Sequence, residues 1–186
     1  MNKKPLEKLS AAYRLLNPGC VVLVTVGDEN RDNIFTVTWN MPLRREPGMV
    51  ALLSGKRHFS YPYMVKTGEF GLNIPDASIA EAVLGCGSVS GKTEPDKFAR
   101  FGLTRQLPVH IKAPLIAEAV GSLECRICQI VDLGASSLLI AQILSATVVS
   151  EHFQAGTWIF DNGLRLLHHL GGKSFCVSDQ ALVVGS

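Results

Sequence analysis

The sequence has almost no excess charge, since 18 lysines and arginines nearly balance 16 acidic residues, for a formal net charge of +2. A balance this even excludes the strongly basic surface of a nucleic-acid-binding protein and the polybasic patch of a membrane-surface protein. Charged residues are also few, at 18%, beside 47% hydrophobic residues, which excludes a disordered chain. No internal repeat or low-complexity linker divides the chain, so we expect a single domain over residues 1–186.

Long apolar runs are missing too. The strongest early run, CVVLVTV at residues 20–26, is far too short to cross a bilayer. The amino-terminal lysines are followed by no unbroken apolar stretch like that of a secretion signal, so we expect a cytoplasmic protein. The five cysteines are an odd number, and we expect no disulfide framework.

Familiar site motifs are scarce. Neither GxxxxGK[ST] nor GxGxxG occurs, and the one CxxC, Cys125 to Cys128, has no second pair to complete a zinc site. It lies in SLECRICQIV, which is typical of a strand, where residues three apart point to opposite faces. We therefore interpret both cysteines as structural. No carboxylate pair or Ser-His-Asp arrangement can be identified from spacing.

The pattern of apolar and turn residues predicts a mostly β protein. The predicted strands are 20–26, 33–40, 49–54, 69–74, 118–131, 137–149 and 164–169. The predicted helices are 6–16, 58–66, 79–84 and 96–101; turns are expected at 27–32 and 132–136, and loops at 42–47 and 85–97. Long strands without long helices between them favour an antiparallel barrel with short helices packed outside, and not a Rossmann sheet.

Three segments have a composition that suits a ligand. The strand NIFTVTWN, residues 33–40, has a small, mostly polar face and a face of large side chains. The loops SGKRHFSY (54–61) and GCGSVSGK (85–92) combine glycine, hydroxyls and basic residues, which suits either an anion site or a solvated turn. His168 and His169 point to opposite faces of a strand, either as structural residues or as ligands. A flat phosphorylated ligand, FMN or a nucleotide, fits this combination.

The motifs, in their order, resemble the flavin reductase-like, FMN-binding split-barrel family and, within it, the flavoredoxin branch. The resemblance spans nearly the whole chain, from NPG and CVVLVTV through NIFTVTWN, KRHFS, GEFGLNIP and CGSVSGKTEPDKF to HLGGKSF. It implies a six-stranded antiparallel split β-barrel of Greek-key type with short flanking helices, assembled as a homodimer with FMN at or near the subunit interface.

The resemblance also implies a set of flavin contacts. These are Asn33, Thr36, Val37, Thr38, Trp39, Asn40, Ser54, Arg57, His58, Ser60, Ser88, Ser90, Lys92, Lys97, His169 and Phe175. Two departures stand out: relatives often have a histidine in the turn matched by residues 134–137, and a tyrosine where this chain has Phe175.

The implied function is that of an FMN-binding flavoprotein oxidoreductase that takes electrons from NADH or NADPH. The alternative is a flavoredoxin-type electron-transfer protein that holds FMN and exchanges electrons with a protein partner. Neither needs a catalytic acid, base or metal, because the chemistry belongs to the cofactor. A split barrel that uses histidines and cysteines to bind haem or a metal instead is the third interpretation.

Overall fold

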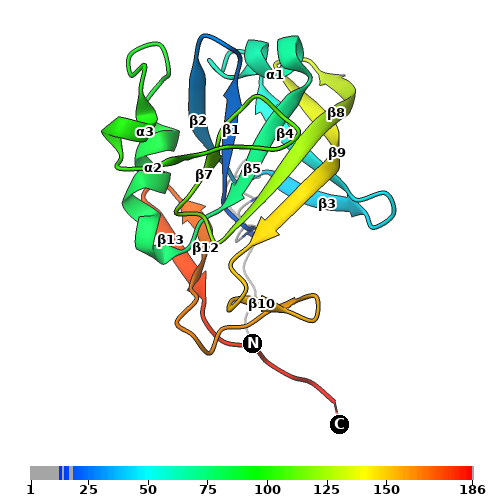
Figure 1. The fold of residues 1–186 in the computed structure, drawn as a ribbon, viewed down its shortest axis with the longest axis vertical. Helices are drawn as coiled ribbons and strands as arrows, with labels where there is room; N and C mark the ends of the chain where they lie inside the picture. The colour runs from blue at the N-terminus through cyan, green and yellow to red at the C-terminus, as the bar shows by residue number, and fades with distance from the viewer. Residues whose placement is uncertain (1–12, 14, 17–18, 186) are drawn as a thin grey trace, which may run out of the picture.

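The computed structural model describes residues 13, 15–16 and 19–185, and its centre is one antiparallel sheet of seven strands (Figure 1). In chain order these are β1 (Val22–Gly27), β2 (Asp32–Val37), β3 (Asn40–Arg44), β4 (Met49–Gly55), β5 (Glu69–Ile74), β8 (Gly121–Leu133) and β9 (Ser136–Val148). Their order in the sheet is β2-β1-β5-β8-β9-β4-β3. The mostly β prediction is confirmed, with one strand more in this sheet than the resemblance implied.

The two edges of this sheet are neighbours in the chain. β2 and β3 are the outermost strands, yet only Thr38 and Trp39 separate them. Three peptide steps span only about 11 Å, so the sheet curves enough to bring the end of β2 close to the start of β3. The single strand predicted for residues 33–40 is therefore wrong: it ends at Val37, and a new strand begins at Asn40.

The extra strand is β3, in a segment predicted to be a loop because it begins with Pro42. β3 pairs with β4 through Asn40–Leu52, Met41–Ala51 and Pro42–Val50, and its other side is the sheet edge. Proline lacks a backbone N–H, which excludes it from central strands but not from an edge. Pro42 therefore indicates an edge strand and not a loop.

Short helices cover the sheet. They are α1 (Tyr61–Thr67), the 3-10 turn η2 (Ala77–Ile79), α2 (Ala80–Ser88) and α3 (Lys97–Arg100). The predicted end of α2 at Gly85 is wrong, because the helix continues to Ser88. A Cβ atom at Gly85 would overlap the ring of Phe101, so this glycine allows close packing and does not end the helix. The helix predicted at 6–16 lies almost wholly outside the described residues.

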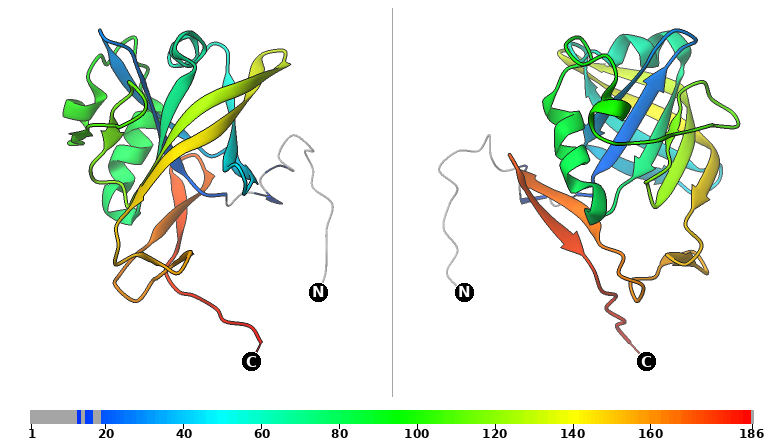
Figure 2. Two further views of the ribbon diagram at one scale, coloured as in Figure 1. Left: turned by 45° about the vertical axis from the view of Figure 1, so that its right-hand side comes forward. Right: turned by 60° about the vertical axis from the view of Figure 1, so that its left-hand side comes forward.

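Two apolar cores lie on opposite faces of the strands. One fills the inside of the curled sheet, where Val24, Leu52 and Phe70 are fully buried. The other lies between the sheet and α2, and joins Ile34 of β2 to Val83 and Cys86 of the helix (Figure 2). α2 is thereby fixed against the outer face of β2.

Three small hairpins complete the chain. They are β6 (Arg105–Gln106) with β7 (Leu115–Ile116), β10 (Phe153–Gln154) with β11 (Thr157–Trp158), and β12 (Leu166–Gly171) with β13 (Ser174–Ser178). The strand predicted at 164–169 corresponds to β12, which lies below the main sheet in Figure 2 and is bridged through His168 to Cys20, just before β1. Within the described ranges, no helix is both long and apolar enough to cross a membrane.

Candidate functional site

Two adjoining pockets lie along β2. The first, here the loop pocket, has a volume of about 300 Å³ and is formed by β2, the turn before α1, the end of α2 and the segment after it. Its lining residues are Asn33, Phe35, Thr36, Arg57, His58, Phe59, Ser60, Cys86, Gly87, Ser88, Val89, Ser90, Gly91 and Lys97. The second, here the Trp39 pocket, has about 210 Å³ and is lined by Phe35, Thr36, Val37, Thr38, Trp39, Leu53, Gly55 and His58. Phe35, Thr36 and His58 line both, so the two form one continuous site.

Most of the predicted contact residues meet at these pockets. The loop pocket gathers Asn33, Thr36, Arg57, His58, Ser60, Ser88, Ser90 and Lys97, and the Trp39 pocket adds Val37, Thr38 and Trp39. These residues come from three separate segments of the sequence, at positions 33–39, 57–60 and 88–97. The two loops singled out by composition do face each other across the end of β2.

The other predicted residues lie elsewhere. Ser54 is buried on the face of β4 that carries Val50 and Leu52 into the inner core, whereas its neighbour Leu53 lines the Trp39 pocket. Alternation along the strand therefore removes Ser54 from the pocket wall. The Asn40 amide is occupied by a hydrogen bond to the carbonyl of Cys20, 2.9 Å away.

Three further predicted residues do not line either pocket. Lys92 is exposed beyond the loop pocket. His169 and Phe175 form a ring pair, 5.3 Å between centroids, on the β12–β13 hairpin. Nε2 of the other histidine, His168, lies 2.8 Å from the hydroxyl of Ser178, which is a structural contact.

Lys97 is the most informative residue of the loop pocket. Its side chain is 3% exposed, and its ammonium group donates hydrogen bonds of 2.8 Å to the carbonyls of Ile34 and Cys86. Burial lowers the pKa of Lys97, an effect partly offset by the Cys86 thiol and by Glu94. No carboxylate lies within 4.0 Å of it among the described residues. Lys97 also lines the loop pocket, so an anion bound there would stabilise this buried cation.

The rest of the loop pocket is also suited to an anion. Arg57 and His58 are exposed at its edge, and its lining contains no aspartate or glutamate. Asn33 donates a 2.7 Å hydrogen bond to the hydroxyl of Ser60, which leaves that hydroxyl its own proton to donate. Basic side chains, a free hydroxyl proton and the backbone around Ser90 are the groups that recognise phosphate.

The small face of residues 33–40 is not fully accessible to a ligand. Ile34 is fully buried against α2, and the hydroxyl of Thr36 donates a hydrogen bond to the carbonyl of Val83 on that helix. α2 therefore covers the first half of this face. Thr36 nevertheless lines both pockets and Thr38 lines the Trp39 pocket, so contact of these two residues with a ligand stays a prediction.

The end of β2 explains how Thr38 and Trp39 can line one pocket although they are adjacent in sequence. Neither residue is in a strand, so the alternation of strand side chains does not separate them. Trp39 is 49% exposed and contacts Tyr13 edge to face, with ring centroids 5.6 Å apart. Both rings line a largely apolar hollow of about 440 Å³ that is also bordered by Met41, Leu53 and Leu138.

Some residues of the site were not found from the sequence. Phe35, Phe59 and Gly91 line the loop pocket, and a Cβ atom at Gly91 would overlap the Phe59 ring and lie 2.8 Å from Oδ1 of Asn33. Phe59 stood in the KRHFS motif and could have been chosen for its aromatic ring. Gly91 lies in the GCGSVSGK loop, but its close packing could not be predicted because its neighbours Phe59 and Asn33 are more than thirty residues away in sequence.

The cysteines give no reactive centre at the site. Cys86 lines the loop pocket, but burial raises the pKa of its thiol to about 12 despite the opposing effect of Lys97. In the CxxC, Cys125 is buried and Cys128 is exposed, which confirms that the two thiols diverge. In the part of the chain that the structure describes, no cluster of three or more His, Cys, Asp or Glu could hold a metal ion.

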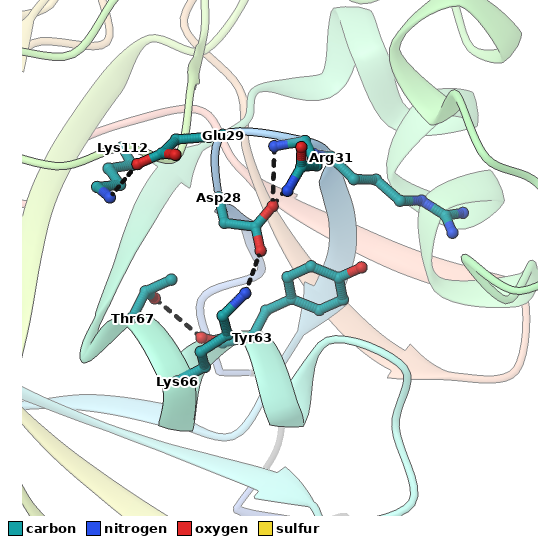
Figure 3. A network of polar contacts seen from close by, with 8 residues as sticks. Asp28, Glu29, Arg31, Tyr63, Lys66, Thr67 and Lys112 are labelled. Atoms are coloured by element: carbon teal, nitrogen blue, oxygen red, sulfur yellow. Dashed lines mark hydrogen bonds and ion pairs between the residues drawn. The ribbon is translucent and has the colours of Figure 1, made fainter.

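A separate polar network stabilises the turn between β1 and β2 (Figure 3). The Asp28 carboxylate forms a 2.7 Å ion pair with Lys66, at the end of α1. It also accepts hydrogen bonds from the backbone N–H groups of Asn30 and Arg31. The Lys66 hydrogen bond and these amides hold the pKa of Asp28 below its usual range. Next to it, Glu29 pairs with Lys112 at 2.9 Å. This network lies outside both pockets but fixes the turn that begins β2.

Comparison with known proteins identifies the family of this chain. The family model of the flavin reductase like domain matches residues 14–172. The uncharacterised protein YddH of Escherichia coli is 34% identical over 186 residues, which cover 97% of each chain.

Solved structures share the fold at lower identity. The flavoredoxin of Desulfovibrio vulgaris (Miyazaki F) has a TM-score of 0.84 at 22% identity, with 98% of this chain and 97% of that chain covered. An FMN-binding domain of a flavin reductases-like enzyme from Shewanella baltica has a TM-score of 0.81 at 23% identity, with 96% and 95% covered.

Proposed function

Because the chain belongs to the flavin reductase-like family, we propose that it binds FMN along β2 and works as an oxidoreductase with NADH or NADPH as electron donor. The observation that carries this proposal is the buried ammonium of Lys97, which has no carboxylate partner among the described residues and lines the loop pocket. The loop pocket adjoins a second pocket walled by Phe35, Val37 and Trp39. One ligand with a phosphate and an apolar ring system would use both.

The residues present fit the cofactor. We assign the phosphate to the loop pocket, where Lys97, Arg57 and the Ser60 hydroxyl provide positive charge and donors. The isoalloxazine ring is assigned to the Trp39 pocket, where Thr38 offers a short polar side chain and Trp39 a flat one. FMN supplies the site that accepts electrons, and the protein binds it, orients it and limits the access of water.

No residue of either pocket needs to be an acid or base in this proposal. The lining contains no carboxylate, and the one thiol, Cys86, is held in its neutral form by burial. The task of the pocket residues in this proposal is therefore to bind and orient the cofactor. His58 lies where both pockets meet, and we assign it the junction between phosphate and ring.

A second candidate is electron transfer to a protein partner without a direct nicotinamide reaction. One observation favours it: Trp39 and Met41 are each 49% exposed beside the Trp39 pocket, which leaves an apolar surface next to the proposed ring position. A solved neighbour of the same fold is a flavoredoxin. The same exposed surface would also suit the proposed homodimer.

We also retain three finer proposals on architecture. The approach of β2 to β3 through Thr38 and Trp39 supports a split barrel, the family match over residues 14–172 supports one domain, and the apolar surface near Trp39 supports dimer formation. Sedimentation of the purified protein would test the dimer.

The experiment that separates the two functions is anaerobic mixing of the FMN-loaded protein with NADH or NADPH. Rapid loss of the flavin absorbance, followed by turnover when free FMN is added, is expected for the reductase. A protein that holds FMN but reacts with neither nucleotide would contradict the reductase and support the carrier. A protein that neither holds nor quenches FMN would contradict both.

A further inference from the structure

We propose that Arg31 is a positioning residue that fastens the segment 89–95 over the loop pocket and so sets how long a phosphate-bearing ligand stays bound. The effect on ligand residence rests on the proposed function, which identifies the ligand. The fastening of segment 89–95 by Arg31 does not depend on that function. Arg31 does not line either pocket. It acts through Gly91 and Phe59, which line the loop pocket.

The contacts of the Arg31 guanidinium are unusual for a surface turn. Its Nη2 donates a hydrogen bond to the carbonyl of Gly91, sixty positions later in the chain. Its Cζ lies 4.6 Å from the centre of the Phe59 ring, on which the planar group stacks. Within the described part of the chain, no carboxylate lies within 4.0 Å of it. The group is thus used to join two walls of the pocket and not to form an ion pair.

The segment it fastens has mainly internal bonds. The carbonyl of Ser90 accepts the N–H groups of Thr93 and Glu94, at 3.1 and 3.0 Å, and its hydroxyl accepts the N–H of Lys92. These bonds shape a turn but do not hold it to the sheet. Outside the turn, Glu94 makes a long ion-pair contact of 3.9 Å with Arg100, whereas Gly91 is buried between Phe59 and Asn33 and its carbonyl accepts the Arg31 hydrogen bond.

The backbone of Arg31 is fixed in turn. Asp28 accepts the N–H of Arg31 at 3.3 Å and donates its own N–H to the carbonyl of Arg31 at 2.9 Å. Lys66 holds the other oxygen of the Asp28 carboxylate. Figure 3 shows the guanidinium extending away from this network. A fixed backbone and a stacked planar end leave the side chain little freedom, which suits it for holding another segment in place.

Phe59 links this fastening to the ligand residues. It lies between His58 and Ser60, which line the loop pocket, and its ring also contacts Tyr63 with centroids 5.4 Å apart. Loss of the guanidinium would free the ring and the Gly91 carbonyl together. We therefore expect Arg31 to affect both sides of the pocket, at residues 58–60 and 89–91.

The test uses Arg31→Ala and Arg31→Lys, with Arg126→Ala as a matched control from the exposed surface of β8. The first measurement is hydrogen exchange of the ligand-free protein. Amides of residues 89–95 should exchange faster in Arg31→Ala than in the wild type, while amides of β4 and β9 keep their protection. Arg31→Lys should fall between, because lysine keeps the charge but cannot stack as a plane. Unchanged exchange at residues 89–95 would overturn the proposal.

The second measurement is the rate at which FMN fluorescence returns after dilution of the FMN-loaded protein. Release should be about tenfold faster or more in Arg31→Ala, as expected for the loss of a charge-assisted hydrogen bond, and unchanged in Arg126→Ala. Faster exchange with unchanged FMN release would overturn the role in residence time. If the wild type holds no FMN, the proposed function fails, while the exchange measurement still decides whether Arg31 fastens the segment.

Discussion

The ammonium group of Lys97 lies 2.8 Å from the carbonyl oxygen of Ile34, so that α3 is tied directly to β2. The same group caps the carbonyl of Cys86 near the carboxyl end of α2, where a cation is favoured by the helix dipole. One buried side chain thus connects the three elements that form the loop pocket. Lys97 therefore contributes both to the stability of the fold and to the proposed ligand site.

Replacement of Lys97 by methionine tests this coupling. Two carbonyls lose a donor, so the free energy of unfolding should fall by about 1–3 kcal/mol, measured by urea denaturation. FMN affinity should fall at least about tenfold, while the weaker binding of riboflavin, which lacks the phosphate, should change little. An equal loss for both flavins would contradict the placement of the phosphate at Lys97.

Trp39→Ala should weaken FMN binding and leave the fold intact. The side chain is 49% exposed, so its removal should cost the folded state less than about 1 kcal/mol. Loss of an aromatic contact with the ring should reduce FMN affinity roughly tenfold, and Trp39→Phe should restore most of it. Fluorescence titration measures both. Unchanged affinity in Trp39→Ala would show that the ring does not lie in the Trp39 pocket.

Gly91→Ala should displace the segment after α2. The added Cβ would overlap the Phe59 ring and crowd Asn33, and overpacking of this kind costs about 1–3 kcal/mol. FMN binding should weaken together with thermal stability. Gly48→Ala is the matched control, since its Cβ would lie 3.4 Å from Ile143, an ordinary contact. Equal melting temperatures for the two variants would contradict the tight packing at Gly91.

The Asp28–Lys66 pair predicts a pH dependence with a definite sign. Because the hydrogen bond from Lys66 lowers the pKa of Asp28 in the folded state, its stabilisation is present above the ordinary aspartate pKa of about 3.9. It is lost as the pH falls through the lowered value. Asp28→Asn should therefore be less stable than the wild type at pH 7, and the difference should shrink towards pH 2. A difference independent of pH would contradict this assignment.

Most of the residues predicted for the site lie together in the structure, whereas a few of them line neither pocket. Glycine, hydroxyls and basic residues identified the segments around Ser60 and Ser90, because phosphate-binding loops need those groups locally. Ser54 does not line either pocket because its position in β4, which pairs with β9, places its side chain on the face of the inner core. Arg31 escaped notice because its partners Phe59 and Gly91 are distant in sequence, and only the fold brings them together.

The segment NIFTVTWN also shows that sequence alone does not predict long-range arrangement. Residues 34–39 have high β propensity, yet the chain leaves the strand at Thr38 because it must pass from one edge strand of the sheet to the other. Local propensity contains no information about that closure. The tertiary arrangement overrides it, and the break allows both Thr38 and Trp39 to face the same pocket.

The most direct test of the account is a titration of the purified protein with FMN, followed by flavin fluorescence. We expect the protein to quench FMN fluorescence in a saturable way, with about one FMN per chain. Lys97→Met should clearly lower the affinity for FMN, and Arg126→Ala should leave it unchanged. FMN fluorescence that stays unchanged at saturating wild-type protein would contradict the claim that the pockets along β2 hold this cofactor.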